Sequence, residues 1–430
     1  MGKHYARVVD IRHASDALDE IAGIGVTPLA TRWMADESVL RAVRLEAVSG
    51  RAASLLKQEA LALGAECAVA RSVAGFDDAP QPVLLIATLK QHRILTRKLA
   101  AQPFGLRLLA DEVTNALEVY DRREPRLLVI GRHELPLGTR TLVMGIINTT
   151  PDSFSGDGLG DNVQAAVDQA KRFADEGADI LDVGGQSTRP GSEAVGAEIE
   201  AGRVLPVIER VAAEVDVAAS IDTSRAGVAA AALDAGAGMI NDVYALRGEG
   251  MLNLAAERRV PVCLMHMLGT PRTMQQAPHY EDVISDIYRF LADRVEACVL
   301  AGVPREAVLV DPGIGFGKSV NHNLTIIRRL REFRSLGCPL LIGASRKSLI
   351  GKALGDLPPS DRLEGTAATC ACAILNGAEI IRVHDVKEMV RVARMTDAIV
   401  HGVAGEAQRN NGAPETDAPE VASRPNESAA

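Results

Sequence analysis

Residues 141–158 read TLVMGIINTTPDSFSGDG, and this stretch decides the fold. It begins as an apolar run with the character of a buried strand, and at Asn148 it changes into a polar, Gly-rich segment. A buried parallel strand delivers polar groups to a ligand at its C-terminal end in this way. We therefore interpret the stretch as the first strand of a parallel sheet, followed by a functional loop.

The same plan of apolar strand and polar tip recurs further along the chain, with helical segments between the strands. We expect strands at residues 142–148, 178–184, 218–223, 239–243, 261–266, 307–312, 340–345 and 379–385. We expect helices at residues 163–176, 199–214, 226–235, 252–258, 283–301, 324–335, 361–375 and 387–400. Eight such units in about 260 residues are typical of a (β/α)8 TIM barrel. A doubly wound open sheet is the alternative, but no GxGxxG sequence follows a first strand to support it.

The residues before this region alternate shorter elements and predict a separate small α/β domain. We expect strands at 5–11, 40–48 and 82–89, and helices at 14–22, 52–63 and 110–120. Glycines and a proline break the pattern near residues 131–138, so the domain boundary should lie within 122–138. The expected organisation is an N-terminal domain at 1–130, a barrel at 139–402 and a disordered, Pro- and Ala-rich tail at 405–430.

Composition limits the classes of function. The net charge of −9 and the aromatic content of 3% argue against nucleic acid or an anionic membrane as the main partner. No apolar run reaches the roughly 18 residues of a membrane span, and the N-terminus lacks the apolar core of a signal peptide. The six cysteines are scattered and form no zinc-type pairs, so we expect reduced thiols in a cytoplasmic protein.

If the chain is a barrel, its chemistry belongs at the strand tips. Each expected tip carries polar side chains, and the residues that matter most are Asn148, Asp182, Asp222, Asn241, Asp311, Ser345, Lys347, Arg382 and His384. Carboxylates and amides converging on one mouth suit a flat heterocycle with N–H donors and ring acceptors. A lysine among them can donate to a ring carbonyl or nitrogen. The tips therefore predict a pocket for a planar, polar ring.

Two of these residues predict an anion site beside the ring. Arg382 and His384 are two apart on one strand, so their side chains point the same way. Such a pair, with backbone N–H groups, suits a phosphate-type anion. Asn148 offers a neutral oxygen to a Mg²⁺ that is carried on phosphate oxygens. Arg189, in the loop after the second strand, places a cation near a second, acidic substrate.

Three other patterns have ordinary explanations. Residues 313–319 end like a phosphate-binding P-loop, but Pro312 occupies the position of the first glycine, so that motif fails. His266 lies in an apolar run without a second ligand at metal spacing, and a core or mouth histidine is the better interpretation. Asp77 and Asp78 are adjacent acids in a loop, as solvated turn residues usually are.

The ordered set of tip sequences resembles dihydropteroate synthase. The matching segments are NTTPDSF, DVGGQSTRPG, IDTS, INDV, CLMHM, DPGIGFGK, GASRKS and IRVHDV, which lie in the order and spacing of that family within residues 140–400. The resemblance implies a transferase of folate biosynthesis. It would condense 6-hydroxymethyl-7,8-dihydropterin diphosphate with 4-aminobenzoate, giving 7,8-dihydropteroate and diphosphate by a dissociative, SN1-like route.

The resemblance also implies a role for each matched residue. The pterin ring would be held by Asp222, Asn241, Asp311 and Lys347. The diphosphate would be bound by Asn148, Arg382 and His384, with Asn148 as a ligand of Mg²⁺. The 4-aminobenzoate would be framed by Thr188, Arg189, Pro190, Phe316 and Ser345. The catalytic residues would be Asp182, Lys347, Arg382 and His384.

The family further implies a homodimer formed through the late helices. A pterin-binding barrel that transfers methyl groups, or one without catalysis, would need the ring pocket alone. The presence of both Arg189 and the Arg382/His384 pair argues against it. A second folate enzyme in the N-terminal domain would need an acidic metal pair in a strand context, which the sequence lacks. We expect residues 1–125 to have a structural or partner-binding role.

Overall fold

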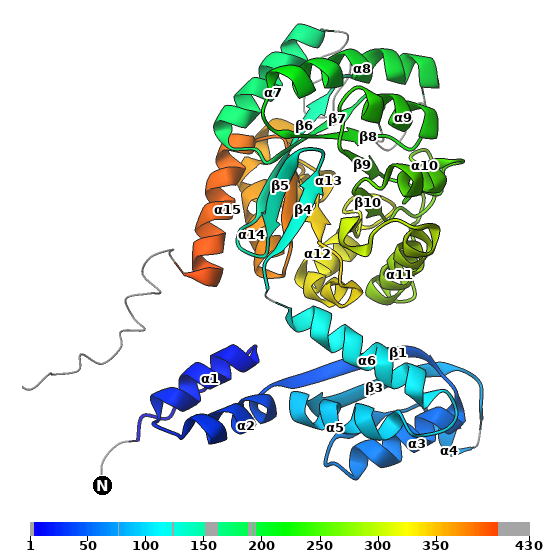
Figure 1. Cartoon of the computed structure of the whole chain (residues 1–430), viewed down its shortest axis with the longest axis vertical. Coiled ribbons are helices and arrows are strands. Elements are labelled where there is room, and N and C mark those ends of the chain that lie inside the picture. The colour runs from blue at the N-terminus through cyan, green and yellow to red at the C-terminus, as the bar shows by residue number, and fades with distance from the viewer. Residues whose placement is uncertain are drawn as a thin grey trace, which may run out of the picture.

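The chain forms a small N-terminal α/β domain and a larger barrel, which lies above the small domain in Figure 1. The computed structural model describes residues 4–75, 77–122, 124–150, 162–187, 192 and 195–402. The tail expected at 405–430 lies outside these residues.

Within the described residues, eight strands form one parallel sheet in the order β11-β10-β9-β8-β7-β6-β13-β12. These strands are β6 (Leu142–Asn148), β7 (Ile180–Gly184), β8 (Ala218–Asp222), β9 (Met239–Asp242), β10 (Val262–Met265), β11 (Val308–Asp311), β12 (Leu341–Ile342) and β13 (Ile380–Val383). A parallel bridge between Val310 and Leu340 joins the two ends of the sheet and closes it. The predicted (β/α)8 barrel is confirmed, and the open-sheet alternative is wrong.

Helices surround the barrel (Figure 1). They are α7 (Val163–Glu176), α8 (Ala197–Glu214), α9 (Ala226–Asp234), α10 (Met251–Arg258), α11 (Val283–Ala301), α12 (Val320–Arg328), α13 (Ser348–Ala353), α14 (Leu363–Leu375) and α15 (Val386–His401), with short 3-10 helices η1 (Arg305–Ala307), η2 (Leu330–Leu336) and η3 (Pro359–Asp361). Strand side chains alternate: Val143 and Ile147 pack against the helices, whereas Leu142 and Met144 fill the barrel. The single helix expected at 324–335 is wrong in its second half, which is η2.

A hairpin of β4 (Arg126–Ile130) and β5 (His133–Leu137) closes the bottom of the barrel. Leu128, Ile130 and Leu137 are each about 1% exposed, and they pack in one cluster with the first residues of the barrel strands, among them Leu142. The hairpin falls inside the interval 122–138 in which the boundary was expected. It packs with the barrel, so the N-terminal domain ends before it.

The N-terminal domain contains a three-stranded antiparallel sheet in the order β1-β3-β2. Its elements are α1 (Ala14–Gly23), α2 (Pro28–Ser38), β1 (Leu40–Val48), α3 (Gly50–Leu61), β2 (Glu66–Ala68), α4 (Arg71–Ala74), β3 (Gln81–Thr88), α5 (Leu89–Leu99) and α6 (Leu106–Asp121). The strand expected at 5–11 is wrong. Residues 4–12 have no regular structure because no strand pairs with them, and Val8 is 98% exposed.

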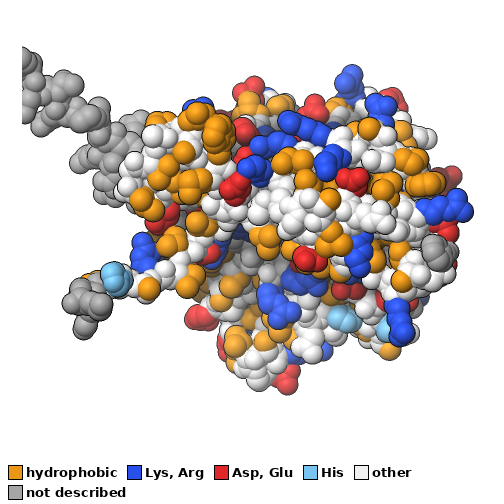
Figure 2. All heavy atoms as spheres, turned by 90° about the horizontal axis from the view of Figure 1, so that it is seen from below, with side chains coloured by type: hydrophobic (Ala, Val, Ile, Leu, Met, Phe, Trp, Pro, Cys, Tyr) orange, Lys and Arg blue, Asp and Glu red, His pale blue; other side chains and the backbone are white. Residues whose placement is uncertain are grey.

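Basic and acidic side chains are interspersed with apolar ones on the face that Figure 2 shows, viewed from below. Several charges of the N-terminal domain form ion pairs between its helices, such as Arg93 with Asp36 at 2.7 Å and Lys98 with Glu59 at 3.4 Å. Exposed pairs of this kind stabilise a fold by less than about 1 kcal/mol each. The domain is therefore held mainly by its own apolar core, which includes Leu56.

The N-terminal domain contacts the barrel where the end of α6 meets η2. Arg334 donates hydrogen bonds to the carbonyl oxygens of Tyr120 at 2.9 Å and Arg122 at 2.7 Å, so it caps the end of α6. His13 lies between the Asp121 carboxylate at 3.2 Å and the Arg331 guanidinium, also at 3.2 Å. Among the described residues, no helix is long and apolar enough to cross a membrane.

Candidate active site

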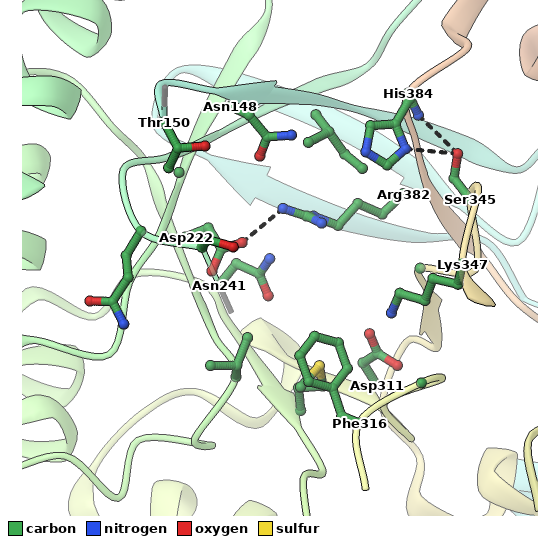
Figure 3. Close-up of a pocket in the computed structure, with 18 of the residues that line it drawn as sticks. Asn148, Thr150, Asp222, Asn241, Asp311, Phe316, Ser345, Lys347, Arg382 and His384 are labelled. Carbon is green, nitrogen blue, oxygen red and sulfur yellow. Dashed lines mark hydrogen bonds and ion pairs between the residues drawn. The ribbon is translucent and has the colours of Figure 1, made fainter. Parts of the chain in front are cut away.

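A cavity of about 210 Å³ opens at the C-terminal ends of the barrel strands (Figure 3). Nine of the residues predicted for the site line it: Asn148, Asp222, Asn241, Asp311, Phe316, Ser345, Lys347, Arg382 and His384. They come from strands far apart in the sequence, and barrel closure brings their tips to one mouth. The predicted convergence of the strand tips is thus present in the structure.

Arg382 lies across one side of the cavity and points toward Asp222 (Figure 3). Its Nε donates to Asp182 Oδ2 at 2.6 Å, and its Nη2 donates to Asp222 Oδ2 at 2.8 Å. Asp182 also accepts from Asn241 Nδ2 at 2.9 Å and has no exposed surface. Asp222 and Arg382 face the cavity. Asp182 does not line the cavity, and its hydrogen bonds orient Arg382 and Asn241.

Lys347 and Asp311 lie on the opposite side of the cavity, beside Phe316 (Figure 3). Lys347 donates to the carbonyl oxygen of Ile314, and its Nζ is 4.4 Å from the centre of the Phe316 ring. Asp311 Oδ1 accepts from the Gly313 amide at 2.7 Å, which fixes the start of the loop that carries Phe316. This side thus offers a cation, a carboxylate and an aromatic face within one wall.

The tips of β12 and β13 are tied together at the rim. His384 Nδ1 is 2.9 Å from Ser345 Oγ, and the His384 amide donates to the same oxygen at 3.2 Å. The turn that follows Ser345 is held by Arg362, which donates to the carbonyl oxygen of Arg346 at 2.8 Å. This turn directs Lys347 into the cavity.

The charges of the site influence one another because they are shielded from water. Burial raises the pKa of Asp222 to about 7, while the guanidinium of Arg382 opposes this rise. Burial raises the pKa of Asp311, and Lys347 opposes that rise. Burial lowers the pKa of Lys347 to about 8, against the attraction of Asp311. For Arg382, burial opposes the charge, but Asp182 and Asp222 more than compensate and raise its pKa.

Some lining residues had no signal in the sequence. Met274 reaches the cavity from the loop after β10, and it packs with Val243 and Met265 in a small apolar cluster beneath Phe316. Nothing in the spacing of Met274 distinguishes it from a core methionine. The predicted residues Thr188, Arg189 and Pro190 lie outside the described residues.

Comparison with known proteins assigns this barrel and its pocket to a class. The family model of pterin binding enzymes matches residues 144–384. A dihydropteroate synthase from Synechocystis sp. is 46% identical over 276 residues, which cover 64% of this chain and 96% of that protein. The structure of a Xanthomonas albilineans dihydropteroate synthase with 4-aminobenzoic acid has 45% identity and a TM-score of 0.61, covering 65% of this chain and 99% of the other.

The chain therefore belongs to the pterin binding enzymes, and the matched residues span its barrel and most of the cavity lining. Within this class it is a member of the dihydropteroate synthase family, whose enzymes are transferases of folate biosynthesis.

The N-terminal domain also has a counterpart. A probable bifunctional folylpolyglutamate synthase/dihydropteroate synthase from Halobacterium salinarum is 40% identical over 398 residues, which cover 92% of this chain and 47% of that protein. This alignment is longer than the barrel, so it extends into the N-terminal domain. That domain therefore accompanies the barrel in a haloarchaeal relative as well.

Proposed function

We propose that this chain condenses 6-hydroxymethyl-7,8-dihydropterin diphosphate with 4-aminobenzoate by a dissociative route in the cavity at the strand tips. The observation that carries the proposal is the placement of Arg382 between two carboxylates at one side of the cavity, opposite Lys347. Arg382 thus suits a departing anion, and the carboxylates, the Asn241 amide and Lys347 around the cavity suit a polar ring.

The pterin ring is held by Asp222, Asn241, Asp311 and Lys347, which supply acceptors and donors to its edges. Asp182 acts as a positioning residue, because its contacts are with Asn241 and Arg382 and it has no exposed surface. Phe316 and Ser345 line the cavity where the second substrate, 4-aminobenzoate, binds. The family resemblance assigns the same substrate to Thr188, Arg189 and Pro190, which lie outside the described residues.

The diphosphate binds at Arg382 and His384. As the bond between the exocyclic methylene carbon and the diphosphate oxygen breaks, its electron pair leaves with the oxygen, and the dihydropterin ring delocalises the cation. The guanidinium of Arg382 then faces the growing negative charge of the leaving group. The lone pair of the 4-aminobenzoate nitrogen forms the new C–N bond, after which the nitrogen loses a proton to water.

Asn148 lies at the tip of β6 and lines the cavity, so its amide oxygen fits a Mg²⁺ that is held chiefly by substrate phosphates. The described residues contain no group of three or more His, Cys, Asp or Glu that could hold a metal. When bound, Mg²⁺ supplies positive charge that favours departure of the diphosphate.

A homodimer through the late helices is supported by exposed apolar residues on α14 and α15. Leu375 is 40% exposed, Met395 63% and Ile399 65%. A cytoplasmic location is supported by the cysteines, all six of which are free and all but Cys372 buried.

Product formation tests the proposed reaction. With the pterin diphosphate, Mg²⁺ and 4-aminobenzoate, the purified protein is expected to release 7,8-dihydropteroate and diphosphate in equal amounts, measured by chromatography and mass spectrometry. Removing Mg²⁺ with a chelator is expected to abolish turnover, and adding it back should restore turnover. A folded protein that gives no dihydropteroate with all three components would exclude the reaction.

A further inference from the structure

Lys318 follows the Gly-rich loop after β11, and its side-chain amine lies in the interior. The residue is 2% exposed, and Asp311 is the acidic side chain that acts on its charge. Its Nζ has three acceptors: the Phe316 carbonyl oxygen at 2.9 Å, the His266 carbonyl oxygen at 3.3 Å and His266 Nδ1 at 3.0 Å. Burial lowers the pKa of Lys318 well below its usual value, against the attraction of Asp311, so hydrogen bonds hold this amine.

His266 is suited to this contact because its imidazole is neutral. Burial is the main cause, and with the nearby charge of Lys318 it lowers the pKa of His266 to about 2. The neutral ring can then accept at Nδ1 from Lys318. The ring also packs edge-on against Phe290, with 4.9 Å between the ring centres, so its orientation is fixed by packing.

The loop that Lys318 supports lies directly on the chain after β10. Gly313 and Gly317 have left-handed φ values of 72° and 67°. A Cβ on Gly313 would lie 1.9 Å from the carbonyl oxygen of His266, and one on Gly317 would lie 2.6 Å from that of Leu268. Lys318 therefore joins two segments in close contact, with one hydrogen bond to the loop and two to His266.

Two lysines thus hold this loop from opposite sides. Lys347 donates to the carbonyl oxygen of Ile314 from within the cavity, whereas Lys318 donates to that of Phe316 from the interior. Between these two bonds the Phe316 ring faces the cavity (Figure 3). The position of the ring in the wall thus depends on a group that does not itself line the cavity.

We propose that Lys318 is a positioning residue for the second substrate, because its hydrogen bonds to Phe316 and His266 hold the Phe316 ring where 4-aminobenzoate binds. The inference rests on the proposed function, which places that substrate beside Phe316. It gives a role to the lysine of the failed P-loop pattern and to the histidine of the CLMHM segment.

Kinetics of Lys318→Met test this role. Methionine keeps most of the side-chain length but offers no donor, so the KM for 4-aminobenzoate is expected to rise about tenfold. The KM for the pterin diphosphate and kcat at saturating 4-aminobenzoate should stay within about twofold, because the hydrogen bonds of Lys318 are to Phe316 and His266 and not to the side chains that hold the ring. The matched control is Lys352→Met, which replaces an exposed lysine of α13 and should leave all three parameters unchanged.

His266→Phe removes one of the three acceptors and should raise the same KM by a smaller factor. The double variant should have the same KM for 4-aminobenzoate as Lys318→Met alone, because both substitutions remove the same contact between the Lys318 and His266 side chains. An unchanged 4-aminobenzoate KM in folded Lys318→Met, or an equal rise in the KM of both substrates, would overturn the proposal. If Lys318→Met does not fold, His266→Phe decides by the same comparison.

Different results would overturn the proposed reaction and the positioning role of Lys318. A wild-type protein that makes no dihydropteroate overturns the proposed reaction. In that case the Kd of 4-aminobenzoate, measured by calorimetry in the presence of the pterin diphosphate, still tests Lys318. A Kd that is unchanged in folded Lys318→Met would then overturn the positioning role, and a roughly tenfold weaker Kd would support it.

Discussion

Replacing Arg382 by methionine is expected to lower kcat/KM for the pterin diphosphate by about a thousandfold. The guanidinium pairs with both Asp182 and Asp222, so its loss leaves two carboxylates without their counter-charge. The departing diphosphate also loses its nearest cation, and removing one donor from a developing negative charge costs up to about a thousandfold in rate. The KM for 4-aminobenzoate should change little, because Phe316 is on the other side of the cavity.

Steady-state kinetics with each substrate varied in turn measure this effect, and circular dichroism checks the fold. Arg382→Lys keeps the positive charge, but an ammonium lacks the planar guanidinium that donates to both Asp182 and Asp222. This variant should therefore recover only part of the activity. Arg258→Met is the matched control, because Arg258 pairs with Asp234 on the surface and neither residue lines the cavity. A folded Arg382→Met enzyme within threefold of wild type would contradict the role given to Arg382.

Removing residues 1–138 is expected to unfold the barrel, whereas removing residues 1–124 should leave it folded. The longer deletion takes away the β4–β5 hairpin, and with it Leu128, Ile130 and Leu137. Burying three such side chains contributes roughly 5–9 kcal/mol, which is comparable with the whole stability of an ordinary domain. The shorter deletion removes mainly the contacts between α6 and η2. Water can then accept the hydrogen bonds that Arg334 donates to the carbonyl oxygens at the end of α6.

Thermal melts of the two truncated proteins measure this difference. A point variant gives the same test in the full chain: Ile130→Ala should lower the free energy of unfolding by about 2–5 kcal/mol. Val129→Ala is its control on the same strand, since Val129 is 50% exposed and should matter little. Equal melting temperatures for the two truncated proteins would show that the hairpin does not close the barrel.

The barrel could be predicted because its strands are buried on both faces. Such strands read as continuous apolar runs that end sharply at polar residues, as in 142–148, and each observed barrel strand lies within its expected range. The N-terminal domain was harder. Its helices α2 and α5 were not predicted, and residues 5–11 have strand-like composition but no partner strand among the described residues. Pairing is a tertiary property that composition does not contain.

The contacts within the site also could not be predicted from the sequence. The side chains at the tips could be predicted because a barrel brings tips together whatever the sequence between them. Their pairing could not: nothing in the sequence indicates that Arg382 connects Asp182 and Asp222, or that Asp182 lies behind the cavity. Lys318 is another example, because its contact with His266 joins two loops 52 positions apart.

The order of bond breaking is tested most directly by positional isotope exchange. The pterin diphosphate is prepared with ¹⁸O in the bridge between the methylene carbon and the α-phosphorus, and it is incubated with the enzyme, Mg²⁺ and benzoate, which lacks the amine. If the C–O bond breaks first, the label moves into the non-bridging positions of the α-phosphorus, as ³¹P NMR can follow. A label that stays in the bridge, in an enzyme that turns over with 4-aminobenzoate, would contradict the dissociative route.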